Sequence, residues 1–168
     1  MYVCRVWPAA LLLLLAGCHR VQTPASVIRM DNPVTASQLI SGFYDIEGEG
    51  NNLWRWTGPD FKLALAPPPA SRDGARLVLQ LYFPETQIQK LGPMTLTAFI
   101  DGQPLAPETY STSGSYDFVR NVPACLLDTN VLPIAFRLNP YSPKSASQGR
   151  DLGAVVLTAA LEPGAGKQ

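Results

Sequence analysis

Hydrophobic and polar residues alternate with a period of two along much of this chain. The alternation is clearest in residues 75–83, where Leu77, Leu79, Leu81 and Phe83 occupy every second position. Residues 61–66 and 94–100 repeat the pattern. Successive side chains of a β-strand point to opposite faces of a sheet, so the pattern predicts strands with one buried face.

Further short segments are predicted to be strands because they are rich in aromatic or β-branched residues and bounded by turn formers. They are residues 43–47, 53–57, 103–105, 115–120, 131–138 and 152–161. Asp101-Gly102 predicts a β-hairpin between residues 94–100 and 103–105. Residues 84–93 are predicted to form a loop that has room for one helical turn at 86–90.

The fold class follows from these short segments and the sixteen prolines, most of which fall between them. No segment shows eleven residues of helical periodicity without a proline or glycine break. The sequence therefore predicts an all-β fold, an antiparallel β-sandwich of about eight or nine strands resembling a jelly roll. An immunoglobulin-like sandwich is the alternative, although its Cys, Trp and Cys spacing is absent.

The first residues have the layout of a secretory signal, with Arg5 followed by the short apolar run 9–16 and small residues. That run is shorter than the roughly 20 residues needed to span a bilayer. We expect a signal peptide over 1–17, a lipidated N-terminus and flexible tether over 18–39, a sandwich over 40–162 and a disordered tail over 163–168.

The signal ends in Leu15-Ala16-Gly17-Cys18, which resembles the bacterial lipobox. This resemblance implies cleavage before Cys18, acylation of Cys18 with chains such as palmitate, and anchoring in a membrane. His19 stands where an aspartate is associated with inner-membrane retention, so the outer membrane is favoured, on its periplasmic or surface face. The alternative is an ordinary cleaved signal in which Cys18 is incidental.

Composition narrows the partners of the chain. Hydrophobic residues make up 46% of 168, enough for one core, and a formal net charge of zero argues against nucleic acid as a partner. Cys4 would leave with the signal and Cys18 would carry lipid, which leaves Cys125 without a disulfide partner. The apolar neighbours of Cys125 predict a small buried thiol.

The sequence offers no catalytic constellation. The single histidine, His19, lies beside the predicted anchor, and no phosphate-binding loop or set of metal ligands is recognisable. Glu47 and Glu49 as a carboxylate pair, or the acidic turn with Asp45 as a calcium site, find no further support in the spacing. We therefore expect no enzyme, no cofactor and no metal.

Residues 42–58 concentrate aromatic, acidic and amide side chains between glycines. Trp54 and Trp56 are two apart on a predicted strand, so they share a face on which a sugar ring could stack. The ligand-binding residues predicted in this segment are Tyr44, Glu47, Trp54, Arg55 and Trp56. The alternative is that the tryptophans fill the core of the sandwich.

A second interpretation of the same segment is structural. Arg55 would need a carboxylate partner if it were covered, and Glu47 and Asp151 are the candidates. We therefore predict an ion cluster that joins residues 42–58 to the start of the last strand. Its members are Glu47, Arg55, Arg150 and Asp151.

Three segments together resemble small bacterial β-sandwich domains that are similar to carbohydrate-binding or galactose-binding-like jelly rolls. They are Phe43-Tyr44-Asp45-Ile46-Glu47, Trp54-Arg55-Trp56-Thr57-Gly58 and Arg150-Asp151-Leu152-Gly153. The resemblance implies glycan recognition. We expect a non-catalytic, lipid-anchored envelope protein that binds a glycan or envelope polymer. The alternative is an accessory lipoprotein that docks onto a protein partner in the envelope.

Overall fold

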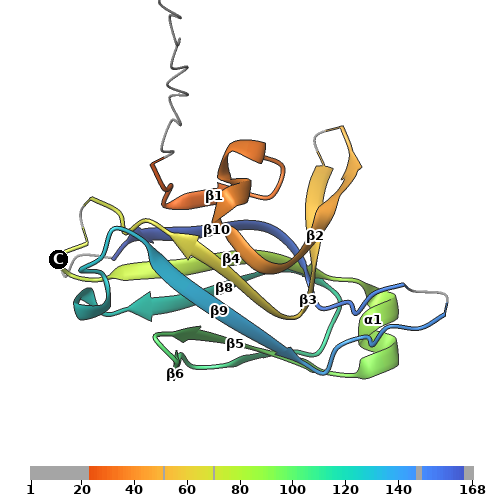
Figure 1. The fold of residues 1–168 in the computed structure, drawn as a ribbon. Coiled ribbons are helices and arrows are strands. Elements are labelled where there is room, and N and C mark those ends of the chain that lie inside the picture. Colours follow the sequence, from red (N-terminus) through yellow and green to blue (C-terminus); the bar gives the residue numbers. More distant parts are fainter. Residues whose placement is uncertain (1–22, 51, 70, 147–148, 165–168) are drawn as a thin grey trace, which may run out of the picture.

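The computed structural model describes residues 23–50, 52–69, 71–146 and 149–164 (Figure 1). Its strands are β1 Val27–Arg29, β2 Leu39–Glu49, β3 Asn52–Leu65, β4 Ala75–Phe83, β5 Met94–Ile100, β6 Gln103–Pro104, β7 Glu108–Tyr110, β8 Gly114–Val122, β9 Leu132–Asn139 and β10 Val155–Pro163. Its helices are the 3-10 helices η1 Pro33–Gln38 and η2 Ala124–Leu126 and the α-helix α1 Glu85–Leu91. Within the described ranges, no helix is long and apolar enough to span a bilayer.

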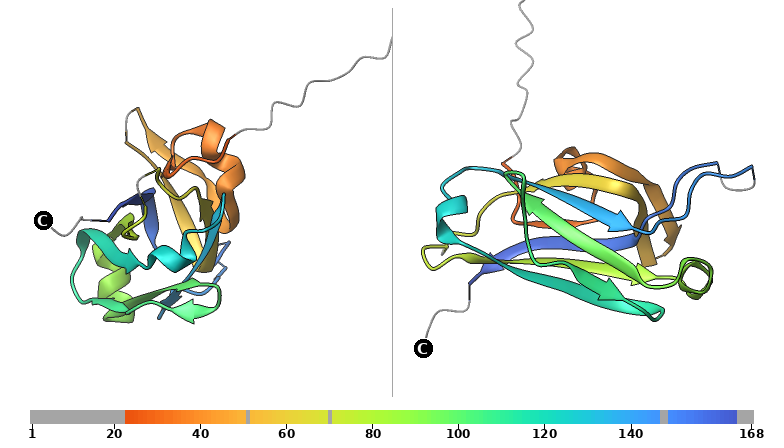
Figure 2. Two further views of the ribbon diagram at one scale, coloured as in Figure 1. Left: turned by 90° about the vertical axis from the view of Figure 1, so that its left-hand side faces the viewer. Right: turned by 90° about the horizontal axis from the view of Figure 1, so that it is seen from below.

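The strands form one antiparallel sheet with the order β6-β5-β9-β3-β10-β4-β8, to which β1, β2 and β7 add at β10, β3 and β5. This sheet curls into two layers, which Figure 1 shows along their length and Figure 2 shows end-on. Strand β3 joins the layers, because residues 60–65 pair with β9 while Arg55 and Trp56 pair with β10. The prediction of an all-β antiparallel sandwich is confirmed.

The core lies between the two layers and is built by the predicted alternation. Every second residue of β4, β5 and β9 is buried. Phe61 of β3 stacks on Phe136 of β9 with ring centres 4.8 Å apart. The alternate residues of β5 and β9 point away from the core. The outer face of these two strands and of the neighbouring β3 can therefore carry polar and aromatic side chains.

The sandwich begins earlier than the predicted residue 40, so the tether predicted over 18–39 is wrong from Ala25 onward. Strand β1 pairs with β10, and Ile28 and Met30 are buried in the core. Their spacing is a strand alternation too short to stand out between Pro24 and Pro33. The predicted signal 1–17, Cys18 and the rest of the lipidated N-terminus to residue 22 lie outside the described residues.

Three further expectations need correction. Cys125 is exposed, since it belongs to η2, which buries none of its residues; the buried side chain is that of Leu127, directly after this helix. Residues 85–91 form a full α-helix, α1, that begins after Pro84. Pro163 belongs to β10 and still pairs with β4, so the tail begins later than predicted. Residues 165–168 lie outside the described residues.

Candidate functional site

The aromatic and acidic segment forms the β2–β3 hairpin, which packs against the segment preceding β10. The Tyr44 hydroxyl donates a hydrogen bond of 2.7 Å to the Asp151 carbonyl. The Arg150 guanidinium lies 4.5 Å from the centre of the Tyr44 ring and forms an ion pair with Glu47. Tyr44 and Glu47 are therefore occupied by contacts within the fold.

The structure brings together only part of the predicted ion cluster. Arg55 Nη1 donates to the Tyr44 carbonyl at 2.7 Å, and its Nε donates to the Met30 carbonyl at 3.2 Å. The expected carboxylate partner of Arg55 is therefore replaced by backbone carbonyls. The reason is strand register: Ile46 stands opposite Arg55 and Glu47 stands opposite Trp54, so Glu47 and Arg55 point to opposite faces.

The Asp151 carboxylate has a partner other than Arg55. Its Oδ1 accepts a hydrogen bond of 2.7 Å from the Lys144 amide. The carboxylate thus orders the segment in which it lies. The four residues of the predicted cluster form an ion pair, a carbonyl-binding arginine and a local turn contact. Tyr44 and Glu47 fix the hairpin to Asp151 and Arg150, and Arg55 fixes it to the Met30 carbonyl.

The two tryptophans are both half-buried. The Trp54 ring packs against Gly48 of β2, because a Cβ atom added at Gly48 would lie 2.8 Å from Cζ3 of this ring. Its free edge lines a hollow of about 210 Å³ together with Asp31, Leu157 and other residues. This hollow is smaller than the roughly 300 Å³ at which ligand pockets begin.

Because Tyr44 serves the hairpin, we predict that Tyr44→Phe lowers the free energy of unfolding by about 1 kcal/mol, the net value of one hydrogen bond. Urea denaturation measures this change. Any affinity of the domain for a sugar should stay the same in this variant. A Tyr44→Phe protein with unchanged stability but lost affinity for a sugar would show that the hairpin is the ligand-binding site.

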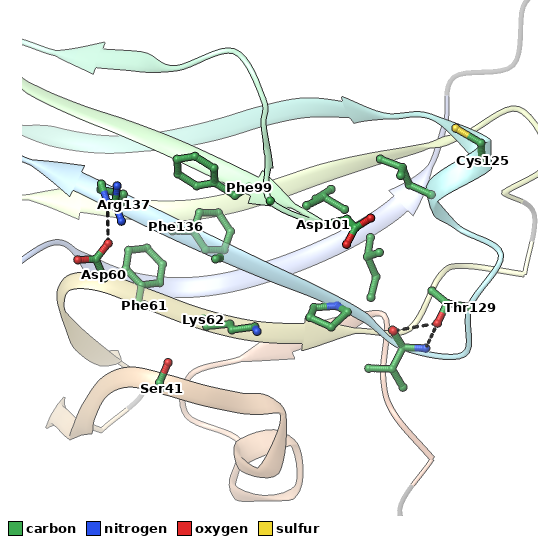
Figure 3. Close-up of a pocket in the computed structure, with 17 residues that line it drawn as sticks. Ser41, Asp60, Phe61, Lys62, Phe99, Asp101, Cys125, Thr129, Phe136 and Arg137 are labelled. Carbon is green, nitrogen blue, oxygen red and sulfur yellow. Dashed lines mark hydrogen bonds and ion pairs between the residues drawn. The ribbon is translucent and has the colours of Figure 1, made fainter.

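A larger groove of about 840 Å³ lies on the outer face of β3, β9 and β5 (Figure 3). Lys62, Ala135 and Phe99 form one row across its floor, since Ala135 stands opposite both of the others in the strand pairing. Asp60 and Arg137 form a neighbouring row. Neither tryptophan lines this groove.

Loops and a neighbouring strand border the groove. The β5–β6 turn contributes Asp101 and Gly102, and the segment after η2 contributes Thr129 and Val131. Ser41 of β2 stands at the opposite border. The Thr129 hydroxyl donates to the Val131 carbonyl at 3.0 Å, which fixes this part of the wall.

One charge of the groove lies at the Phe99 ring, since the Arg137 guanidinium is 5.8 Å from the centre of that ring. Arg137 Nε donates to Asp60 Oδ1 at 2.8 Å, with both side chains about two-thirds exposed at 66% and 64%. Such an exposed pair contributes roughly 0–1 kcal/mol to stability, so both groups are available to a ligand at little cost. Lys62 and Asp101 form no ion pair with any described residue.

This arrangement suits binding of a polar ligand that carries apolar CH groups. Phe99 is half-buried and offers an aromatic surface, and one ammonium, one guanidinium and two carboxylates line the same groove. A sugar ring presents CH groups to an aromatic face and hydroxyls to such polar neighbours. Among the described residues, no group of three His, Cys, Asp or Glu side chains could hold a metal ion.

Sequence reasoning missed Asp60, Lys62, Phe99, Asp101 and Arg137. Lys62, Phe99 and Arg137 occupy outward positions of predicted strands and Asp101 lies in the predicted hairpin turn, whereas Asp60 fell between two predicted strands that the structure joins as β3. That signal does not distinguish them from the outward residues of β4 and β8. Their proximity arises from the pairing of β9 with both β3 and β5, which brings together residues far apart in the chain.

No protein-family model matches this chain, and no curated protein matches it. Solved structures with similar folds include the carbohydrate-binding module CsCBM6-3 of Clostridium stercorarium in complex with cellobiose. That structure has a TM-score of 0.46 and 10% identity, over 83% of this chain and 94% of its own. TmCBM61 in complex with β-1,4-galactotriose has a TM-score of 0.38 and 12% identity, over 69% of this chain and 74% of its own. At these values the likeness transfers neither a ligand nor a site to this chain.

Proposed function

We propose that this chain is a non-catalytic, lipid-anchored protein of the bacterial cell envelope whose sandwich binds a glycan or envelope polymer. The binding site is the groove over β3, β9 and β5. The observation that supports this proposal is the half-buried ring of Phe99 on the floor of a groove of about 840 Å³, which Lys62, Asp101 and the Asp60–Arg137 pair also line.

The floor of the groove is suited to recognition because it is rigid. Lys62 and Ala135 belong to strands paired to each other, and β9 is paired on both of its sides. Side chains held on paired strands keep their positions better than side chains on loops, which lowers the entropy lost on binding. The groove volume falls within the range of known ligand pockets.

In this proposal the predicted ligand-binding residues of the hairpin have a structural role. Tyr44, Glu47 and Arg55 already have partners within the fold, and Trp54 lines only the smaller hollow. We propose that they hold the β2–β3 hairpin, whose first strand supplies Ser41 to the border of the groove. The hairpin thus supports the site without supplying its stacking surface.

Binding is tested with the full chain, purified in detergent, on an immobilised panel of soluble peptidoglycan fragments, lipopolysaccharide-derived oligosaccharides, and β-linked glucans and galactans. Isothermal titration calorimetry then gives the affinity for each ligand that is retained. We expect binding to at least one class of glycan. A folded protein that binds none of them would contradict the proposal and favour docking onto a protein partner.

The anchor is tested by Cys18→Ser, which removes the sulfur atom that would carry lipid. We expect the variant to move from the membrane fraction to the soluble fraction, because several acyl chains on Cys18 would supply stable anchoring. Cys125→Ser is the matched control and should stay in the membrane fraction. Retention of the Cys18→Ser protein in membranes would contradict the anchor, and density separation of wild-type membranes tests the outer-membrane assignment.

A further inference from the structure

We infer that one side of the sandwich, made of β1, η1 and the first residues of β2, docks directly onto the lipid surface of the membrane. We call residues 27–40 the N-terminal cap. The inference rests on the proposed anchor at Cys18. It adds an orientation and a lipid-contacting surface to an anchor that by itself specifies neither.

The first step is the length of chain between the anchor and the fold. The Gln38 side chain bonds both the amide and the carbonyl of Ala25, each at 2.9 Å. The Ala25 carbonyl also accepts from the Ala66 amide at 3.0 Å, and the Ser26 carbonyl accepts from the Leu161 amide at 2.8 Å. The chain is therefore fixed to the sandwich from Ala25 onward.

Cys18 precedes Ala25 by seven positions. Seven residues span at most about 25 Å when fully extended. A compact domain of this size is roughly 35 Å across. The connection is shorter than the domain is wide, so only the side of the sandwich near Ala25 can meet the bilayer.

The second step is the distribution of exposed apolar side chains. The three most exposed large hydrophobic residues among those described are Val34 at 59%, Ile40 at 50% and Val27 at 49%. All three belong to the N-terminal cap, and the other exposed hydrophobic residues reach at most 39%. Figure 1 shows β1 above β10, the strand with which it pairs.

The charge of the cap is compatible with lipid contact. Its two charged residues, Arg29 and Asp31, form an ion pair with 2.9 Å between Nη2 and Oδ2. No unpaired charge of residues 27–40 would therefore have to approach the bilayer. Three partly exposed aliphatic side chains bind a membrane weakly on their own, but a short covalent connection raises their effective concentration at the surface.

The experiment uses the full-length, acylated protein in vesicles of phosphatidylethanolamine and phosphatidylglycerol. In a Cys125→Ser background, Val34→Cys carries an environment-sensitive fluorophore. The comparison protein carries the same fluorophore on native Cys125, which is exposed and lies outside the cap. We expect quenching by aqueous iodide to be at least threefold weaker at position 34 than at position 125.

A flexible insertion of fifteen Gly and Ser residues after Thr23 should reduce this protection, because the cap would no longer be held at the surface. Equal quenching at the two positions in a protein that sediments with the vesicles would overturn the docking while leaving the anchor intact. A protein that does not sediment with them would overturn both. Protection in native membranes but not in protein-free vesicles would assign the cap to a protein partner and also overturn the inference.

Discussion

Phe99→Ala is expected to weaken glycan binding by about ten- to hundredfold. Burial of an aromatic side chain against a ligand contributes about 1.5–3 kcal/mol, and each 1.4 kcal/mol corresponds to roughly a factor of ten in affinity. Phe99 lies in the row with Lys62 and Ala135 on the groove floor, where it supplies the aromatic surface. Isothermal titration calorimetry with a glycan retained on the panel measures the change.

The matched control is Tyr82→Ala on β4, an aromatic residue that is 39% exposed on the outer face of the opposite layer. This variant should bind the glycan like the wild-type protein. Urea denaturation of both variants separates lost binding from lost folding, since the Phe99 ring also lies beneath Arg137. Wild-type affinity in a folded Phe99→Ala protein would show that the groove floor does not stack on the glycan.

Gly42→Ala is expected to lower the free energy of unfolding by more than about 3 kcal/mol. Gly42 has φ +76°, a conformation that disfavours a side chain. An added Cβ would also lie 2.2 Å from the Asp60 carbonyl oxygen and 2.7 Å from Cα of Phe61. Both are backbone atoms of β3 beside the groove, so β2 would have to move away from β3 to relieve the clash.

Gly50→Ala provides the control for the conformational part of this effect. Gly50 has φ +60° in the hairpin turn, and an added Cβ would meet no atom within 4 Å. We expect Gly50→Ala to lower the free energy of unfolding by about 1 kcal/mol, which is the cost of the left-handed conformation alone. Equal losses at the two positions in urea denaturation would show that the close approach of β2 to β3 does not limit stability.

The strands were predictable because their signal is local. Residues 75–83 carry a large apolar residue at every second position from Leu77 and form β4, and Asp101-Gly102 forms the predicted hairpin turn between β5 and β6. Strand β1 escaped prediction because Ile28 and Met30 provide only two buried positions. Their burial depends on pairing with β10, at the other end of the sequence.

The site was less predictable because it depends on which strands become neighbours. Residues 42–58 stand out in the sequence, since their aromatic and acidic side chains are close together along the chain. Their partners, Arg150 and Asp151, lie about a hundred positions away and hold the hairpin in place. Phe99 carries no local mark of function, and it becomes a floor residue only when β5 pairs with β9.

The central claim, that the groove over β3, β9 and β5 binds the glycan, is tested most directly by nuclear magnetic resonance. An isotope-labelled mature chain with Cys18→Ser would be titrated with the retained glycan, and contacts between sugar protons and the Phe99 ring would be measured. We predict such contacts at Phe99, with the largest amide shift changes at Lys62, Ala135 and Arg137. Sugar contacts with Trp54 and Trp56, with the groove amides unshifted, would contradict the account.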